Sequence, residues 1–175
     1  ENTMDAVRYS IESGADYIEI DVQMSADGVI IVLHDDNLKR TTGYNQYAYK
    51  MDYKDIVKLD AGSYFSDAYA GSYIPTLEEV LVECKGKTNI NIELKKVNNS
   101  EYEFVDKVID LIYEYDMQEQ CIITSTAYSY LRYVKKNAPE LRTGFIANML
   151  FGDASSLQYA DFFSVKYVVV TENFV

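Results

Sequence analysis

Apolar spacing along the chain alternates between the period of a strand and the period of a helix, and this alternation restricts the fold most. Five stretches have strand-like spacing: residues 17–23, 88–95, 121–125, 142–147 and 161–165. Helix-like spacing occurs at residues 3–13, 75–84, 101–115 and 127–137. Asn2 or Thr3 can cap the first of these helices. Strands and helices in this order are typical of a parallel sheet with helical crossovers, either an open doubly wound sheet or a (β/α)8 barrel.

The stretch at residues 88–95 favours the barrel. Every second residue from Asn89 to Lys95 is polar, and the residues between them are Ile or Leu. Central strands of a doubly wound sheet are usually apolar on both faces, whereas a barrel strand can turn polar groups inward near its C-terminal end. We therefore predict an α/β fold of the TIM (β/α)8 barrel class, incomplete, with about five of the eight strands. All 175 residues are expected to form a single partial domain.

The first strand is expected to belong to a β-hairpin over residues 17–34. Its turn would be the dipeptide Asp27-Gly28, since Asp-Gly tolerates the positive φ angles of a two-residue hairpin turn. Counting outward from that turn pairs Asp21 with His34, the only histidine of the chain. Directly opposed residues have Cβ atoms roughly 4.5–5.5 Å apart, so the imidazole would lie beside a carboxylate.

Three carboxylates fall in the C-terminal halves of predicted strands: Glu19, Asp21 and Glu93. If they meet at the mouth of a barrel, their oxygens would suit a hard divalent cation, Mg²⁺ or Ca²⁺. The cation would offset their mutual repulsion and attract an anionic substrate. Lys95 lies on the same strand face as Glu93 and could contact a substrate phosphate. His34 is suited to proton transfer near neutral pH.

Each of these features also has an ordinary structural explanation. Glu19 and Asp21 can form the wet face of a half-exposed strand. Glu93 and Lys95 can be a surface pair, and a lone histidine such as His34 can serve as a structural hydrogen-bonding group. From residue spacing alone, the function therefore stays open.

Composition excludes some functions and partners. The chain has 16 Lys and Arg against 28 Asp and Glu, a net charge of −12, which argues against a nucleic-acid surface. No apolar run approaches the ~20 residues that a membrane-spanning helix needs. Cys84 and Cys121 lie outside metal-binding and redox spacings, so we expect them to be buried apolar residues and not a disulfide.

Beyond these patterns, the N-terminal block resembles the glycerophosphodiester phosphodiesterase family. The sequence ENTMDAVRYSIESGADYIEIDVQMSADGVIIVLHDDNLKRTTG is similar to the family's run of ENT, GAD, ExDV, DG, HD and RTTG motifs. The later motifs follow in the family's order: LDAGSYF at residues 59–65, IPTLEEVL at 74–81 and NIELK at 91–95. The resemblance covers essentially the whole chain.

The resemblance implies a TIM barrel that hydrolyses a glycerophosphodiester to glycerol 3-phosphate and an alcohol with the help of a divalent cation. By position, Glu19, Asp21 and Glu93 resemble the family's metal ligands, and Lys95 resembles its phosphate-binding lysine. His34 resembles one of two catalytic histidines, and we expect it to act as the acid that protonates the leaving alkoxide. The partner that this implies is a small-molecule glycerophosphodiester.

Two family motifs are missing from the sequence: His-Arg-Gly, expected before ENT, and Trp-Thr-Val-Asn, expected on a later strand. We therefore expect the 175-residue chain to be a fragment of an active enzyme and inactive, or nearly so, on its own. Two alternatives stay open: a catalytically silent relative that binds glycerophosphodiesters or a metal, and a phospholipase D-like enzyme of the same superfamily. Some members of the family follow membrane-spanning segments in bacteria, which leaves cytoplasmic, membrane-associated and extracytoplasmic locations all open.

Overall fold

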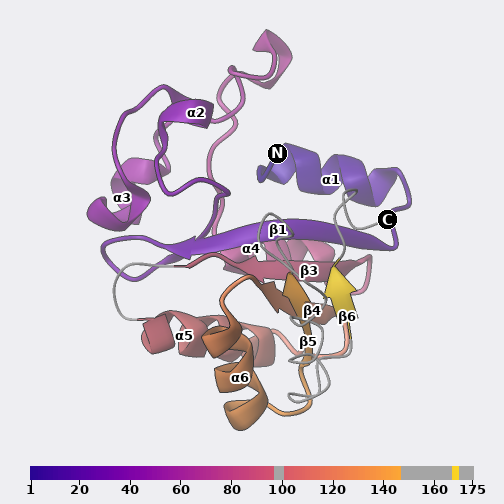
Figure 1. Cartoon of the computed structure of the whole chain (residues 1–175). Helices are drawn as coiled ribbons and strands as arrows, with labels where there is room; N and C mark the ends of the chain where they lie inside the picture. Colours follow the sequence, from indigo (N-terminus) through magenta and orange to yellow (C-terminus); the bar gives the residue numbers. More distant parts are fainter. Residues whose placement is uncertain (97–100, 147–166, 170–175) are drawn as a thin grey trace.

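The computed structural model describes residues 1–96, 101–146 and 167–169, and the strands in these ranges form one sheet (Figure 1). The order across the sheet is β2-β1-β3-β4-β5-β6. The strands are β1 (Tyr17–Met24), β2 (Ile30–Val32), β3 (Asn89–Leu94), β4 (Cys121–Ser125), β5 (Arg142–Ile146) and β6 (Tyr167–Val169). β2 is antiparallel to β1, whereas every pair from β1 to β6 is parallel.

The prediction of an incomplete TIM barrel is confirmed. From β1 to β6 each strand pairs with the next parallel strand along the chain, as in a barrel, and the order never reverses as it does at the switch point of a doubly wound sheet. The predicted strands at residues 17–23, 88–95, 121–125 and 142–147 correspond to β1, β3, β4 and β5. The predicted strand at 161–165, like residue 147, lies outside the described residues.

Helices follow the strands as the sequence pattern predicts. The longer ones are α1 (Met4–Glu12), α4 (Leu77–Cys84), α5 (Glu101–Glu114) and α6 (Tyr128–Asn137). Residues 35–75 hold only short elements: α2 (Lys39–Thr42), η1 (Ala48–Lys50), α3 (Tyr53–Ile56) and η2 (Asp67–Tyr69). Thr76 and Glu79 form a capping box that satisfies the free backbone N–H groups at the start of α4. Among the described residues, no helix is both long and apolar enough to cross a bilayer.

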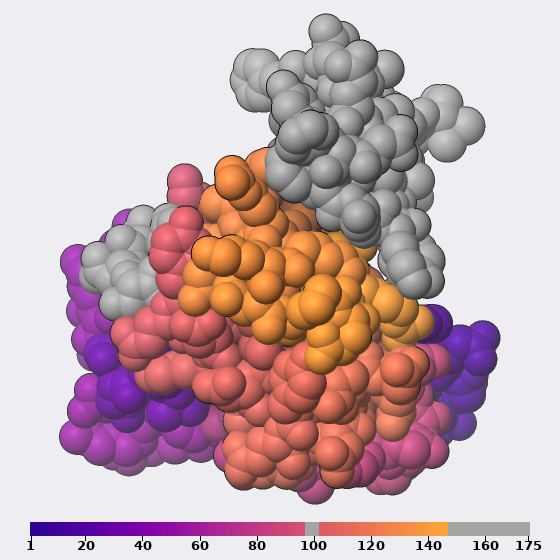
Figure 2. Space-filling view, turned by 90° about the horizontal axis from the view of Figure 1, so that it is seen from below, coloured from indigo at the N-terminus to yellow at the C-terminus, as the bar shows by residue number. Residues whose placement is uncertain are grey.

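The apolar core lies between one face of the sheet and the helices. On β1 and β3 this face consists of partly buried Met24 and of Ile, Val and Leu side chains that are at most 7% exposed. They pack with the buried sides of α1, α4, α5 and α6; α5 and α6 form much of the outer surface in Figure 2. Cys84 and Cys121 are buried and unbonded, as predicted. The helices thus cover the apolar face, and the opposite face of β1 and β3 keeps its polar side chains.

The hairpin register differs from the predicted one by one residue. Val22 pairs with Val32, and the backbone N–H of Leu33 donates to the carbonyl oxygen of Asp21 at 2.9 Å. Asp21 therefore lies opposite Leu33, and the prediction that it pairs with His34 is wrong.

The cause is the length of the loop between the strands. Ser25 donates its backbone N–H to the carbonyl oxygen of Val29 at 3.0 Å, so three residues, 26–28, form the turn and not two. A two-residue type I′ turn needs positive φ at both central residues. Gly28 has a φ of 80°, but Asp27 is absent from the residues with positive φ, so the longer loop forms instead.

Candidate metal and acid–base site

Neighbouring parallel strands bring the three predicted metal ligands together. Asp21 on β1 lies opposite Glu93 on β3, and Glu19 precedes Asp21 by two residues on the same strand face. One oxygen from each carboxylate lies within 4.8 Å of the other two. Asp21 is only 4% exposed, so its charge is largely removed from water. An oxygen-only set of this kind fits a hard divalent cation better than zinc, which prefers nitrogen and sulfur ligands.

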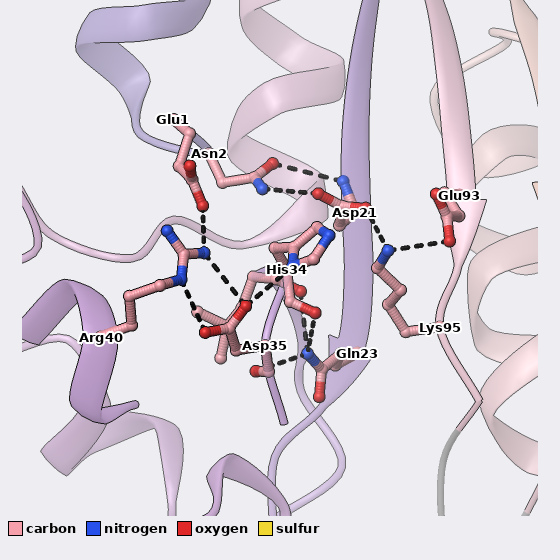
Figure 3. A network of polar contacts seen from close by, with 10 residues as sticks. Glu1, Asn2, Asp21, Gln23, His34, Asp35, Arg40, Glu93 and Lys95 are labelled. Carbon is pink, nitrogen blue, oxygen red and sulfur yellow. Dashed lines mark hydrogen bonds and ion pairs between the residues drawn. The ribbon is translucent and has the colours of Figure 1, made fainter. Parts of the chain in front are cut away.

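Lys95 is a counter-ion within this cluster. Its Nζ atom lies 2.8 Å from Oδ1 of Asp21 and 2.8 Å from Oε1 of Glu93 (Figure 3). Burial acts to lower the pKa of Lys95, but the hydrogen bonds to Asp21 and Glu93 outweigh it and raise the pKa. The ammonium group therefore stays charged between two of the three carboxylates.

Asn2 fixes the orientation of Asp21 with two hydrogen bonds. Its Nδ2 atom donates to Oδ2 of Asp21 at 2.8 Å, and its Oδ1 atom accepts from the backbone N–H of Asp21 at 3.2 Å. Asn2 has a φ of 53°, a left-handed conformation that Asn adopts more readily than most residues. The cap of α1 is therefore Thr3, whose hydroxyl accepts from the N–H of Ala6, while Asn2 supports the carboxylate cluster.

The Glu19 carboxylate has a raised pKa. Desolvation by the surrounding protein, followed by the charges of Asp21 and Glu93, raises its pKa to about 7, although part of the residue is open to solvent. Its side chain lines a cavity of about 290 Å³ between α1 and β1. Near neutral pH, this carboxylate is therefore close to the point where it binds a proton.

We expect the affinity for a divalent cation to fall as the pH decreases from 8 to 6. A proton and a cation compete for the Glu19 carboxylate, whose pKa is about 7. Without a cation, the raised pKa favours folding below the ordinary carboxyl pKa of 4.5, and this contribution is lost as the pH rises through about 7. Calorimetric titration with Ca²⁺ at several pH values measures the trend. Glu19→Gln should flatten it, whereas Glu12→Gln, a change on the exposed part of α1, should not.

His34 lines the same cavity although it is not paired with Asp21 in the hairpin. Together with Glu19 and Asp21 it lines the cavity of about 290 Å³, and its side chain is 54% exposed. The side-chain amide of buried Gln23 donates to three consecutive carbonyl oxygens, those of residues 33, 34 and 35, at 2.9, 3.2 and 2.8 Å. Gln23 thereby bends the chain after β2 and fixes the backbone of His34 beside the carboxylates.

Asp35 contacts the outer side of the imidazole, and Arg40 binds Asp35 from behind. Oδ1 of Asp35 lies 2.8 Å from Nδ1 of His34. The Arg40 guanidinium donates from Nε to Oδ2 of Asp35 at 2.7 Å and from Nη2 to Oδ1 at 3.1 Å, and it also pairs with Glu1 (Figure 3). The ring therefore lies between this ion-pair network and the carboxylate cluster.

The structure brings together all five residues singled out from the sequence, and it adds four that spacing did not identify: Asn2, Gln23, Asp35 and Arg40. The sequence contains one feature that could have identified each of these four residues. Three belong to the ENT, HD and RTTG motifs, and Gln23 shares the polar face of β1 with Asp21. Their hydrogen-bond partners could not be read from spacing, because most of these contacts join different elements.

Comparisons with known proteins show which family the chain resembles. A model of the glycerophosphoryl diester phosphodiesterase family matches residues 1–169. A glycerophosphodiester phosphodiesterase of Caldanaerobacter subterraneus subsp. tengcongensis is 40% identical over 148 residues, 83% of this chain and 60% of that protein. The chain spans about three fifths of the length of that curated relative.

Solved structures give the same result. The crystal structure of a glycerophosphodiester phosphodiesterase from Agrobacterium tumefaciens is 31% identical, with a TM-score of 0.82, and the match covers 96% of this chain and 69% of that one. An Oleispira antarctica phosphodiesterase in complex with the product sn-glycerol-3-phosphate is 26% identical, with a TM-score of 0.89 and coverages of 96% and 68%.

Proposed function

The chain belongs to the glycerophosphoryl diester phosphodiesterase family, and on that premise we propose that it carries the site at which a glycerophosphodiester is hydrolysed to glycerol 3-phosphate and an alcohol. The observation that carries this proposal is the meeting of three carboxylates within 4.8 Å of one another. Two of them, Glu19 and Asp21, line a cavity that His34 also lines. The sn-glycerol-3-phosphate bound to the Oleispira antarctica relative as its product supports the choice of reaction.

In this proposal Glu19, Asp21 and Glu93 hold one divalent cation, and their oxygens suit Mg²⁺ and Ca²⁺ alike. A bound cation would supply positive charge to the phosphoryl group as charge builds up in the transition state. Lys95 adds a second positive charge beside the cation site, where a phosphate oxygen of the substrate can accept a hydrogen bond from it.

His34 supplies the proton for the leaving group. Water adds to phosphorus and releases one proton to the solvent, the bond from phosphorus to the alcohol oxygen breaks, and protonated His34 gives its proton to that alkoxide oxygen. The products are glycerol 3-phosphate and a neutral alcohol. His34 can serve this role because its ring is more than half exposed and lies on the cavity wall, so a substrate can reach it.

The function is tested with two substrates and a chelator. We expect glycerophosphocholine to yield sn-glycerol 3-phosphate, and we expect EDTA to stop the reaction until Mg²⁺ or Ca²⁺ is restored. The assay is made on the 175-residue chain and on any longer natural form of the protein. Release of lysophosphatidate from lysophosphatidylcholine, with no reaction of glycerophosphocholine, would indicate the phospholipase D-like alternative. Binding of glycerophosphocholine without turnover in any form would indicate a silent relative.

A further inference from the structure

The hydrogen bond between His34 and Asp35 determines which ring nitrogen carries a proton. Nδ1 of His34 lies 2.8 Å from Oδ1 of Asp35. An ionised carboxylate can only accept hydrogen bonds, so Nδ1 must be the donor in this contact. In the neutral imidazole the other nitrogen, Nε2, is then unprotonated. It is the atom that gains a proton when the ring becomes charged and gives it up afterwards.

Asp35 stays ionised over the whole pH range in which an imidazole titrates. Its pKa is lowered to about 2, chiefly by the hydrogen bonds from Arg40, with burial opposing the shift and the contact with His34 adding to it. Arg40 binds both oxygens of the carboxylate, a two-point contact that fixes the carboxylate plane as well as its position. Glu1 in turn pairs with the same guanidinium.

One group holds the backbone of His34, and another holds the outer edge of its ring. The side-chain amide of Gln23 donates to the carbonyl oxygens of residues 33, 34 and 35, and these hydrogen bonds stabilise the backbone conformation of His34. Asp35 then leaves the ring one favourable orientation, with Nδ1 on the side of Arg40. Figure 3 shows His34 between this pair and Asp21 with Lys95.

The geometry points to Asp35, held by Arg40, as a positioning residue for His34: it sets the Nδ1–H form of the neutral ring and keeps Nε2 for proton exchange with the substrate. This inference rests on the proposed function for its meaning, because it assigns the atom of His34 that exchanges the proton. Its physical content, the protonation of one nitrogen, needs neither substrate nor metal to be observed.

His34 is the only histidine among these 175 residues, so its ring gives the only imidazole signals in spectra of this chain. Two-bond ¹H–¹⁵N correlation spectra of the ¹⁵N-labelled 175-residue chain, recorded about two pH units above the usual imidazole pKa, report the fraction of each neutral form. We expect the Nδ1–H form to predominate in the wild-type protein. In Asp35→Asn the Nε2–H form, which a histidine side chain favours when it is free in water, should become the major one. Asp35→Glu should restore part of the Nδ1–H population.

Two further variants make the result specific. Asp36→Asn removes the same charge from the neighbouring residue, which is exposed, and it should leave the populations unchanged. Arg40→Met leaves Asp35 in the chain but removes the guanidinium that holds its carboxylate in place. The Nδ1–H fraction should therefore fall, although the group that contacts the ring is unchanged. A wild-type ring mainly in the Nε2–H form, or equal populations in wild type and Asp35→Asn, would overturn the inference. Failure to hydrolyse any glycerophosphodiester would refute the proposed function and leave the NMR result standing.

Discussion

Asp21→Asn is expected to weaken divalent-cation binding by at least roughly 100-fold. Loss of an outer-shell partner typically costs 10–100-fold in metal affinity, and Asp21 would be a direct ligand. The change preserves the shape of the side chain but removes one of three negative charges. Lys95 keeps its ion pair with Glu93, so the variant should still fold. Hydrolysis should fall with the loss of the cation.

Calorimetric titration with Ca²⁺ and with Mg²⁺ measures this effect directly on the 175-residue chain, because all three predicted ligands lie within it. Asp16→Asn is the matched control, since Asp16 is exposed just before β1 and carries the same charge. Thermal unfolding of both variants shows whether either one has lost its structure. Equal affinities of wild type and Asp21→Asn would exclude Asp21 as a ligand.

His34→Asn should lower kcat by ~10²–10⁴-fold, the usual contribution of a positioned general acid. The loss should depend on the leaving group. An alkoxide such as that of choline needs a proton as it leaves, whereas a nitrophenolate leaves without one. We therefore expect a large loss with glycerophosphocholine and a much smaller loss with a nitrophenyl ester of glycerol phosphate.

The comparison of the two substrates separates acid catalysis from a structural role for His34. Damage to the site would lower both rates by a similar factor, and that outcome would remove the acid role. The assay requires an active form of the protein. Asp36→Asn again serves as the control, because Asp36 is exposed two residues from His34.

Sequence periodicity predicted the barrel strands and the carboxylate cluster because both follow from local rules. Alternation placed Glu19 and Asp21 on one strand face, and parallel pairing of β1 with β3 brought Glu93 beside them. The hairpin register could not be predicted in the same way. It depends on the backbone angles of Asp27 and Gly28, and Asp-Gly is compatible with more than one turn.

The roles of the residues that support the site could not be predicted from local sequence patterns, for a different reason. Asn2 reaches Asp21 across 19 residues, and Arg40 reaches Glu1 across 39. Such contacts exist only once the start of α1, the end of β1 and α2 have packed together. Spacing identified Asn2 only as a possible helix cap, a role that Thr3 fills.

The length of the loop at residues 26–28 determines to which face of the sheet each side chain of β2 points. Adding or removing one residue there would turn every later side chain of β2 to the opposite face, while a change of two residues would preserve the faces. The loop is also tied down from outside: Asp27 accepts from the N–H of Tyr53 at 2.9 Å, and Gly28 accepts from Lys107 at 3.0 Å. A turn remote from the carboxylates therefore limits which insertions the site can tolerate during evolution.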